Sequence, residues 1–84
     1  GVKVPAQAVA RQLGGSAEVV GVPDEEWGER VVAITTEAAG LDALRDRVTP
    51  REWAPRQVVV VAEIPRLPNG KPDRVAMRRL AADA

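Results

Sequence analysis

The sequence predicts a small α/β (α+β) domain, with a roughly three-stranded sheet and helices packed on it. Two observations indicate this fold class: runs rich in β-branched residues alternate with runs of helical spacing, and Gly or Pro separates them. The 84 residues make one small domain, with 45% hydrophobic residues and only 2% aromatic residues. Valine and alanine must therefore fill its core.

Three runs have the composition of strands. Residues 17–22 and 30–36 are rich in β-branched residues, and the short turn-rich link between them favours an antiparallel pair. The third run, 57–62, contains four consecutive valines, Val58 to Val61. An uninterrupted apolar run indicates burial on both faces, so we expect residues 58–61 to form the most buried strand. Val2 to Val4 has the pattern of a strand end.

Three further runs have the spacing of helices. Residues 6–13 present one apolar face and stop at Gly14-Gly15, and residues 41–48 form a shorter helix that ends before Pro50. A last helix is expected over 73–82 with Asp73 as its N-cap. Its spacing predicts that Ala76, Met77 and Leu80 face the core and that Arg74, Arg78 and Arg79 face solvent.

A stiffened turn, residues 65–72, separates the valine run from the last helix. Asn69-Gly70 is a strong turn signal, and Pro68 and Pro72 restrict the backbone on either side. Lys71 lies at the tip of this turn and is one of only two lysines, against ten arginines. A lysine in this place is a compact point charge with three donors, suited to an oxyanion. The alternative is an ordinary solvated turn.

Composition excludes several classes of chemistry. Cysteine and histidine are absent, so thiol chemistry, His-based metal sites and Ser-His or Cys-His catalysis are excluded. No apolar run approaches the roughly 20 residues that span a membrane, and no signal peptide is visible. We therefore expect a cytoplasmic protein without a membrane partner. The chain begins without an initiating Met, and we expect it to be a fragment of a longer protein.

Charge is unevenly distributed, although the net charge is zero. Residues 1–63 carry a net charge of −3, and residues 64–84 carry +3. The basic end could meet a small anionic ligand or an acidic partner, or it could be a solvated helix face. Nucleic acid is not expected, because the whole domain is not basic and has few aromatics to stack bases. An acidic cluster, residues 24–26 with Glu29, is read as a solvated turn rather than a metal site.

Three segments, in order, resemble the adenylate-forming superfamily of acyl-CoA synthetases, peptide-synthetase adenylation domains and beetle luciferases. Residues 19–33 resemble its "VVGVPDxxxGExxxA" segment, residues 63–74 its "ELPRTxxGKxxR" segment, and residues 1–4 the end of its "GGxKVxPxEVE" segment. Pro5 follows Val4 directly here, and residues 8–10 replace the acidic "EVE". The compact length and short 41–48 helix resemble the o-succinylbenzoate–CoA ligases of menaquinone biosynthesis.

The resemblance implies that residues 1–84 are the swivelling C-terminal subdomain of an ATP-dependent acid–CoA ligase. Its partners are then the N-terminal domain of the same chain and a small carboxylic acid, with ATP, Mg²⁺ and coenzyme A as substrates. Lys71 matches the adenylation lysine, while Gly70 and Gly1 match positions near the bound substrates, Gly1 near the pantetheine tunnel. The isolated chain should be inactive and should bind no cofactor tightly. A free-standing interaction module that uses the basic C-terminal helix is the alternative.

Overall fold

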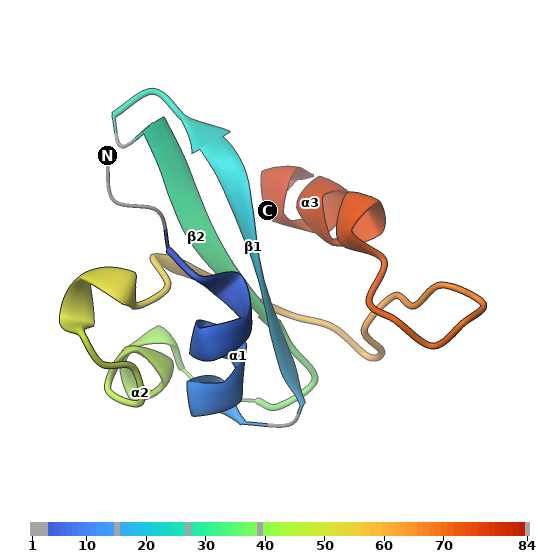
Figure 1. The fold of residues 1–84 in the computed structure, drawn as a ribbon, viewed down its shortest axis with the longest axis horizontal. Helices are drawn as coiled ribbons and strands as arrows, with labels where there is room; N and C mark the ends of the chain where they lie inside the picture. Colours follow the sequence, from blue (N-terminus) through green and yellow to red (C-terminus); the bar gives the residue numbers. More distant parts are fainter. Residues whose placement is uncertain (1–3, 15, 27, 39, 84) are drawn as a thin grey trace.

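Three strands form a mixed sheet with the order β1-β2-β3 (Figure 1). The computed structural model describes residues 4–83 apart from residues 15, 27 and 39. β1 (Ala17–Asp24) runs antiparallel to β2 (Gly28–Thr35), and β2 runs parallel to β3 (Gln57–Val60). The fold class predicted from the sequence is confirmed. The predicted strand end at residues 2–4 lies mostly outside the described residues.

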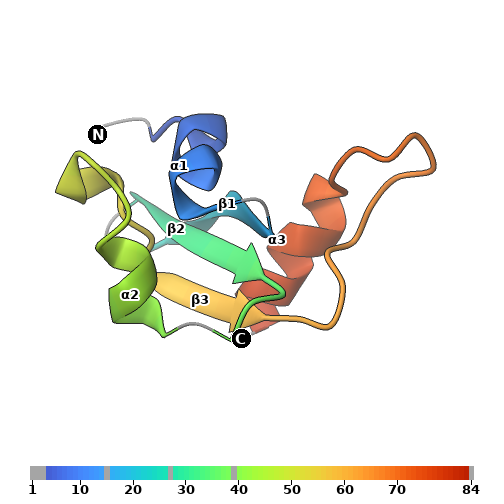
Figure 2. The same ribbon diagram turned by 90° about the horizontal axis from the view of Figure 1, so that it is seen from below.

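Helices cover both faces of the sheet (Figures 1 and 2). α1 (Ala6–Leu13) packs on one face through Val9 and Leu13, and α3 (Arg74–Asp83) packs on the other through Met77 and Ala81. α2 (Leu41–Arg45) and a short 3₁₀ turn (Arg51–Trp53) lie between β2 and β3 in the sequence and add Leu44 and Trp53 to the α1 side. α2 is shorter than the predicted 41–48 helix, although Val48 is still buried.

β2 is the most buried strand, because all of its residues from Val31 to Thr35 are buried. Successive side chains of a strand point to opposite faces, so β2 contributes to two separate cores. The first core lies under α1 and α2 and contains Val9, Leu13, Ala17, Val19, Val31, Ala33, Leu44, Val48 and Ala54. The second core lies under α3 and contains Val20, Val22, Val32, Ile34, Ile64, Met77 and Ala81.

The expectation that residues 58–61 form the most buried strand is wrong. β3 covers only Gln57–Val60 and lies at the edge of the sheet, so it has a neighbour on one side only. Val58 and Val59 are half-buried against opposite cores, which agrees with contacts on both faces, but Val60 is 53% exposed. A run of valines indicates two-sided packing and does not distinguish an edge strand from a central one.

Two predictions about the last helix are also wrong. Leu80, expected in the core, is 37% exposed, and the buried position is taken by Ala81. The reason is that α3 buries Met77 and Ala81, which are one helical turn apart, so Leu80 lies at the margin of that face. Arg74, expected to face solvent, is half-buried, and its Nη1 donates to the carbonyl oxygen of Val19 on β1 at 3.2 Å.

The contrast between β2 and β3 can be tested with one charge in each strand. Ile34→Asp places an unpaired carboxylate in the second core, which costs several kcal/mol or more, so this variant of the 84-residue chain should not fold. Val60→Asp should stay folded and lose less than about 1 kcal/mol, since the side chain reaches water. Urea denaturation followed by circular dichroism measures both. Equal damage by the two substitutions would contradict the assignment.

An ion pair between Glu37 and Arg47 links the segment after β2 to the segment after α2. Arg47 donates to both carboxylate oxygens of Glu37, at 3.1 and 3.2 Å, and its Nη1 also donates to the carbonyl oxygen of Leu13 at 2.8 Å. The hydrogen bonds and the charge of Arg47 lower the pKa of Glu37, and the same pair raises the pKa of Arg47. Both side chains are partly exposed, so the stabilisation is small.

This pair predicts a pH dependence of stability. A carboxylate whose pKa is lowered on folding stabilises the fold above its unfolded-state pKa, about 4.3 for Glu, and loses that contribution as the pH falls through the lower folded value. Glu37→Gln should therefore be less stable than wild type near neutral pH, and the difference should vanish in acid. Glu63→Gln is the control, since the described residues give Glu63 no ion-pair partner. A pH-independent difference for Glu37→Gln would contradict the prediction.

Candidate functional site

Residues 65–72 form a hairpin between β3 and α3 that projects from the body of the domain, and we call it the Lys71 hairpin (Figures 1 and 2). Arg66 and Pro72 pair across its base as an antiparallel bridge. The Leu67 N–H donates to the Lys71 carbonyl oxygen at 2.8 Å, and the Gly70 N–H donates to the Leu67 carbonyl oxygen at 2.9 Å. This is the pattern of a three-residue hairpin loop closed by a turn and a glycine bulge.

Gly70 is the residue in this loop that requires positive φ. Its φ is +87°, while no non-glycine residue among those described has positive φ, so Asn69 stays in an ordinary region. A Cβ at Gly70 would meet nothing within 4 Å, and the need for glycine is therefore conformational rather than steric. The turn predicted from Asn69-Gly70 is confirmed. A role for Gly70 in substrate binding stays a prediction.

Lys71 combines a fixed backbone with a free side chain. Its carbonyl oxygen accepts from Leu67, and its N–H donates to Asn69 Oδ1 at 3.0 Å. The residue is exposed, and within the described part of the chain its ammonium has no hydrogen-bond or ion-pair partner. The arrangement presents the Lys71 ammonium to solvent from a hydrogen-bonded tip.

Asp73 joins the hairpin to α3. Its N–H donates to the Pro65 carbonyl oxygen at 2.9 Å, which closes the base of the hairpin. Its Oδ1 accepts from the Ala76 N–H at 3.1 Å, and its carbonyl oxygen accepts from the Met77 N–H at 3.0 Å. The N-cap predicted at Asp73 is confirmed. The contact of Arg74 with β1 was not predicted, and no sequence signal marks a side chain that binds a distant carbonyl.

Gly1, predicted near the pantetheine tunnel, falls outside the described residues. The acidic cluster lies apart from the Lys71 hairpin (Figure 1). In the acidic cluster, Asp24 forms an ion pair with Arg30 at 3.1 Å, and Glu25 and Glu26 are exposed. Among the described residues, no three acidic side chains come together as metal ligands, and no helix is long and apolar enough to cross a membrane.

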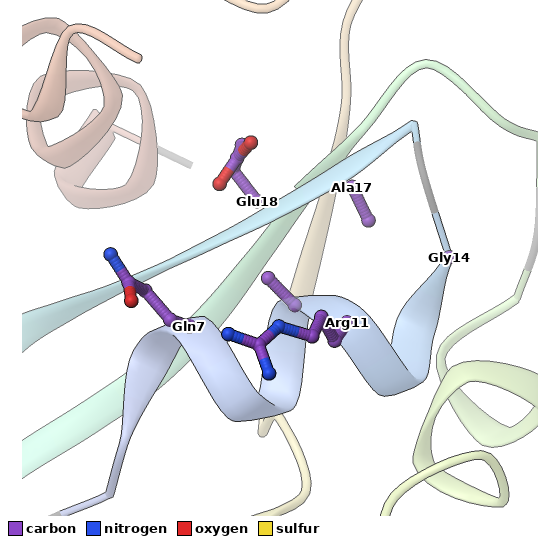
Figure 3. Close-up of a pocket in the computed structure, with 6 residues that line it drawn as sticks. Gln7, Arg11, Gly14, Ala17 and Glu18 are labelled. Atoms are coloured by element: carbon purple, nitrogen blue, oxygen red, sulfur yellow. The ribbon is translucent and has the colours of Figure 1, made fainter. Parts of the chain in front are cut away.

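An open groove of about 370 Å³ lies between α1 and β1 (Figure 3). Gln7 and Arg11 stand on α1 beside it, and Glu18 extends from β1. The lining is completed by Ala10, Gly14 and Ala17, none of which was predicted as a site residue. The groove brings no catalytic set together, so the Lys71 hairpin is the better candidate for the functional site.

The fold and the site together define a small α+β domain that presents a lysine on a hydrogen-bonded hairpin. Residues 8–71 match the model of the AMP-binding enzyme C-terminal domain, and the chain belongs to this family. The match runs from α1 to Lys71 and includes the whole sheet.

Individual relatives agree with this assignment. The chain is 41% identical over 70 residues to the mitochondrial malonate–CoA ligase ACSF3 of Homo sapiens, and 46% identical over 65 residues to the 3-oxocholest-4-en-26-oate–CoA ligase of Rhodococcus rhodochrous. These matches cover 73% and 68% of the chain but only 12% of each relative. The amide bond synthetase McbA of Marinactinospora thermotolerans is 35% identical with a TM-score of 0.78, over 90% of this chain and 18% of that protein.

The capping role of Asp73 leads to a prediction about stability. Asp73→Ala removes the bond to the Ala76 N–H and should cost about 0.5–2 kcal/mol of unfolding free energy. Asp83, in the last turn of α3, is the matched control, because an acid there is disfavoured by the helix dipole. Asp83→Ala should leave stability unchanged or slightly higher in the same denaturation experiment. A neutral Asp73→Ala would show that the bond from the Ala76 N–H to the Asp73 side chain does not stabilise α3.

Proposed function

We propose that residues 1–84 are the C-terminal lid of an ATP-dependent acid–CoA ligase. The family assignment and the ligase names of the relatives support this proposal. The substrates are then a carboxylic acid, Mg²⁺-bound ATP and coenzyme A, and the partner is the N-terminal domain of the same polypeptide. The proposed reaction involves no nucleic acid and no membrane.

The proposal assigns Lys71 to the adenylation step. In that step a carboxylate oxygen attacks the α-phosphorus of ATP, an acyl-adenylate forms and pyrophosphate leaves. Two anions must meet, and negative charge develops at phosphorus, so a preorganised cation lowers the barrier. The observation that supports this role is the exposed Lys71 ammonium, which is free of partners in the described residues while its backbone is fixed.

The second step, transfer of the acyl group to the thiol of coenzyme A, is proposed to need a different position of the lid. The bonds of Asp73 make the hairpin and α3 one unit, so a rotation of the domain carries Lys71 with it. In this proposal Gly70 allows the turn to approach the nucleotide closely, and Gly1 belongs to the segment near the pantetheine of coenzyme A.

The acid that the ligase activates is a separate question, because the acid-binding part of the enzyme is outside this chain. The relatives are named for malonate and for a sterol-derived acid. o-Succinylbenzoate, and with it a role in menaquinone biosynthesis, stays a prediction from the sequence, as does a cytoplasmic location. A panel of these acids, assayed with the full-length protein, distinguishes them.

The assignment of Lys71 can be tested in the full-length protein by separating the two half-reactions. Lys71→Ala should slow acyl-adenylate formation by about 10²-fold or more, the loss expected for a charge-stabilising donor. Lys71→Arg should also fail, because a planar guanidinium does not occupy the position of an ammonium. Pyrophosphate exchange measures this step. With pre-made acyl-adenylate, both variants should form thioester at nearly the wild-type rate.

Two controls complete this experiment. The melting temperature of Lys71→Ala should be unchanged, because no fold contact of the described residues uses the ammonium. The isolated 84-residue chain should show no adenylation and no tight binding of ATP by calorimetry. Equal loss in both half-reactions would refute the role given to Lys71, and micromolar ATP affinity of the isolated chain would favour an independent module over a lid.

A further inference from the structure

The peptide unit between Gly70 and Lys71 is held at both polar ends by side chains. Its carbonyl oxygen, on Gly70, accepts a hydrogen bond of 3.2 Å from Arg66 Nη1. Its N–H, on Lys71, donates to Asn69 Oδ1 at 3.0 Å. These two bonds are additional to the backbone bonds that close the turn, from Leu67 to Lys71 and from Gly70 to Leu67.

The backbone of the hairpin alone does not fix this peptide unit. Neither backbone bond of the turn involves the Gly70 carbonyl oxygen or the Lys71 N–H, and the Lys71 N–H donates to the Asn69 side chain. Gly70 has a φ of +87° and, as a glycine, tolerates many conformations. Rotation of the peptide unit about the Gly70 Cα–C bond is therefore only weakly opposed. Rotation of the unit changes φ of Lys71, the angle that sets the direction of its Cα–Cβ bond relative to the turn.

We propose that Arg66 and Asn69 are positioning residues for Lys71: they clamp the Gly70–Lys71 peptide unit and so fix the direction in which the lysine side chain leaves the hairpin. This inference rests on the proposed role of Lys71 in adenylation. Arg66 and Asn69 act through the lysine and do not need to touch a substrate. Their effect on rate follows from the steep dependence of reaction rates on the placement of a reacting or charge-stabilising group.

Single substitutions in the full-length protein give the first test. Asn69→Ala and Arg66→Met should each lower the rate of pyrophosphate exchange about 5- to 10-fold, the effect of one lost hydrogen bond. Asn69→Ser should recover part of that loss, because a serine hydroxyl at position 69 accepts from the same Lys71 N–H, although more weakly. Gln12→Ala is the matched control. It removes two exposed side chain–backbone bonds to Thr49, far from the hairpin in the sequence, and should leave the rate unchanged.

The deciding measurement repeats Asn69→Ala in a Lys71→Ala background. A residue that acts through the lysine has no further effect once the lysine is gone, so the double variant should match Lys71→Ala alone. A further 5- to 10-fold loss in that background would overturn the inference and show a merely structural role. Unchanged exchange in Asn69→Ala, with Lys71→Ala slow, would also overturn it. An undiminished rate in Lys71→Ala would instead refute the proposed function itself.

Discussion

The burial of β2 from both faces is the constraint on which the rest of the domain depends. Val32, Ala33 and Ile34 are 0% exposed, and successive side chains of this strand enter opposite cores. A chain of this length buries a limited fraction of its surface. Because β2 contributes side chains to both cores, a small number of apolar residues is enough to form them. α1 and α3 therefore pack on opposite faces of the sheet, one helix against each core.

The same packing sets the position of the Lys71 hairpin. Ile64, directly before the hairpin, and Met77, one turn into α3, both belong to the second core. Asp73 connects the two anchors, since it binds Pro65 on one side and Met77 on the other. The place of Lys71 relative to the sheet is therefore determined by buried side chains at both ends of the hairpin, and the hairpin itself determines only the local direction of the lysine.

The sequence predicts those features that depend on local chemistry. The Asn69-Gly70 turn and the Asp73 cap follow from the backbone preferences of residues next to each other, and both are present. The position of β3 at the sheet edge could not be predicted, because a run of four valines is compatible with an edge strand as well as with a central one. The burial of Arg74 depends on a carbonyl that is 55 residues away in the sequence, and local patterns carry no information about such contacts.

Three cations, from the Lys71 hairpin to the first residue of α3, differ in the contacts that they make. Arg66 binds the Gly70 carbonyl oxygen and Arg74 binds the Val19 carbonyl oxygen, so both guanidinium groups are engaged in holding the fold. A guanidinium presents several donors in a fixed plane and suits such contacts, whereas an ammonium is a mobile point charge. Lys71, the one lysine in this segment, keeps its charge free while its backbone is bound. The direction of the charge is thus set by the hairpin, and the flexible side chain retains the reach to adjust to an anion in another domain.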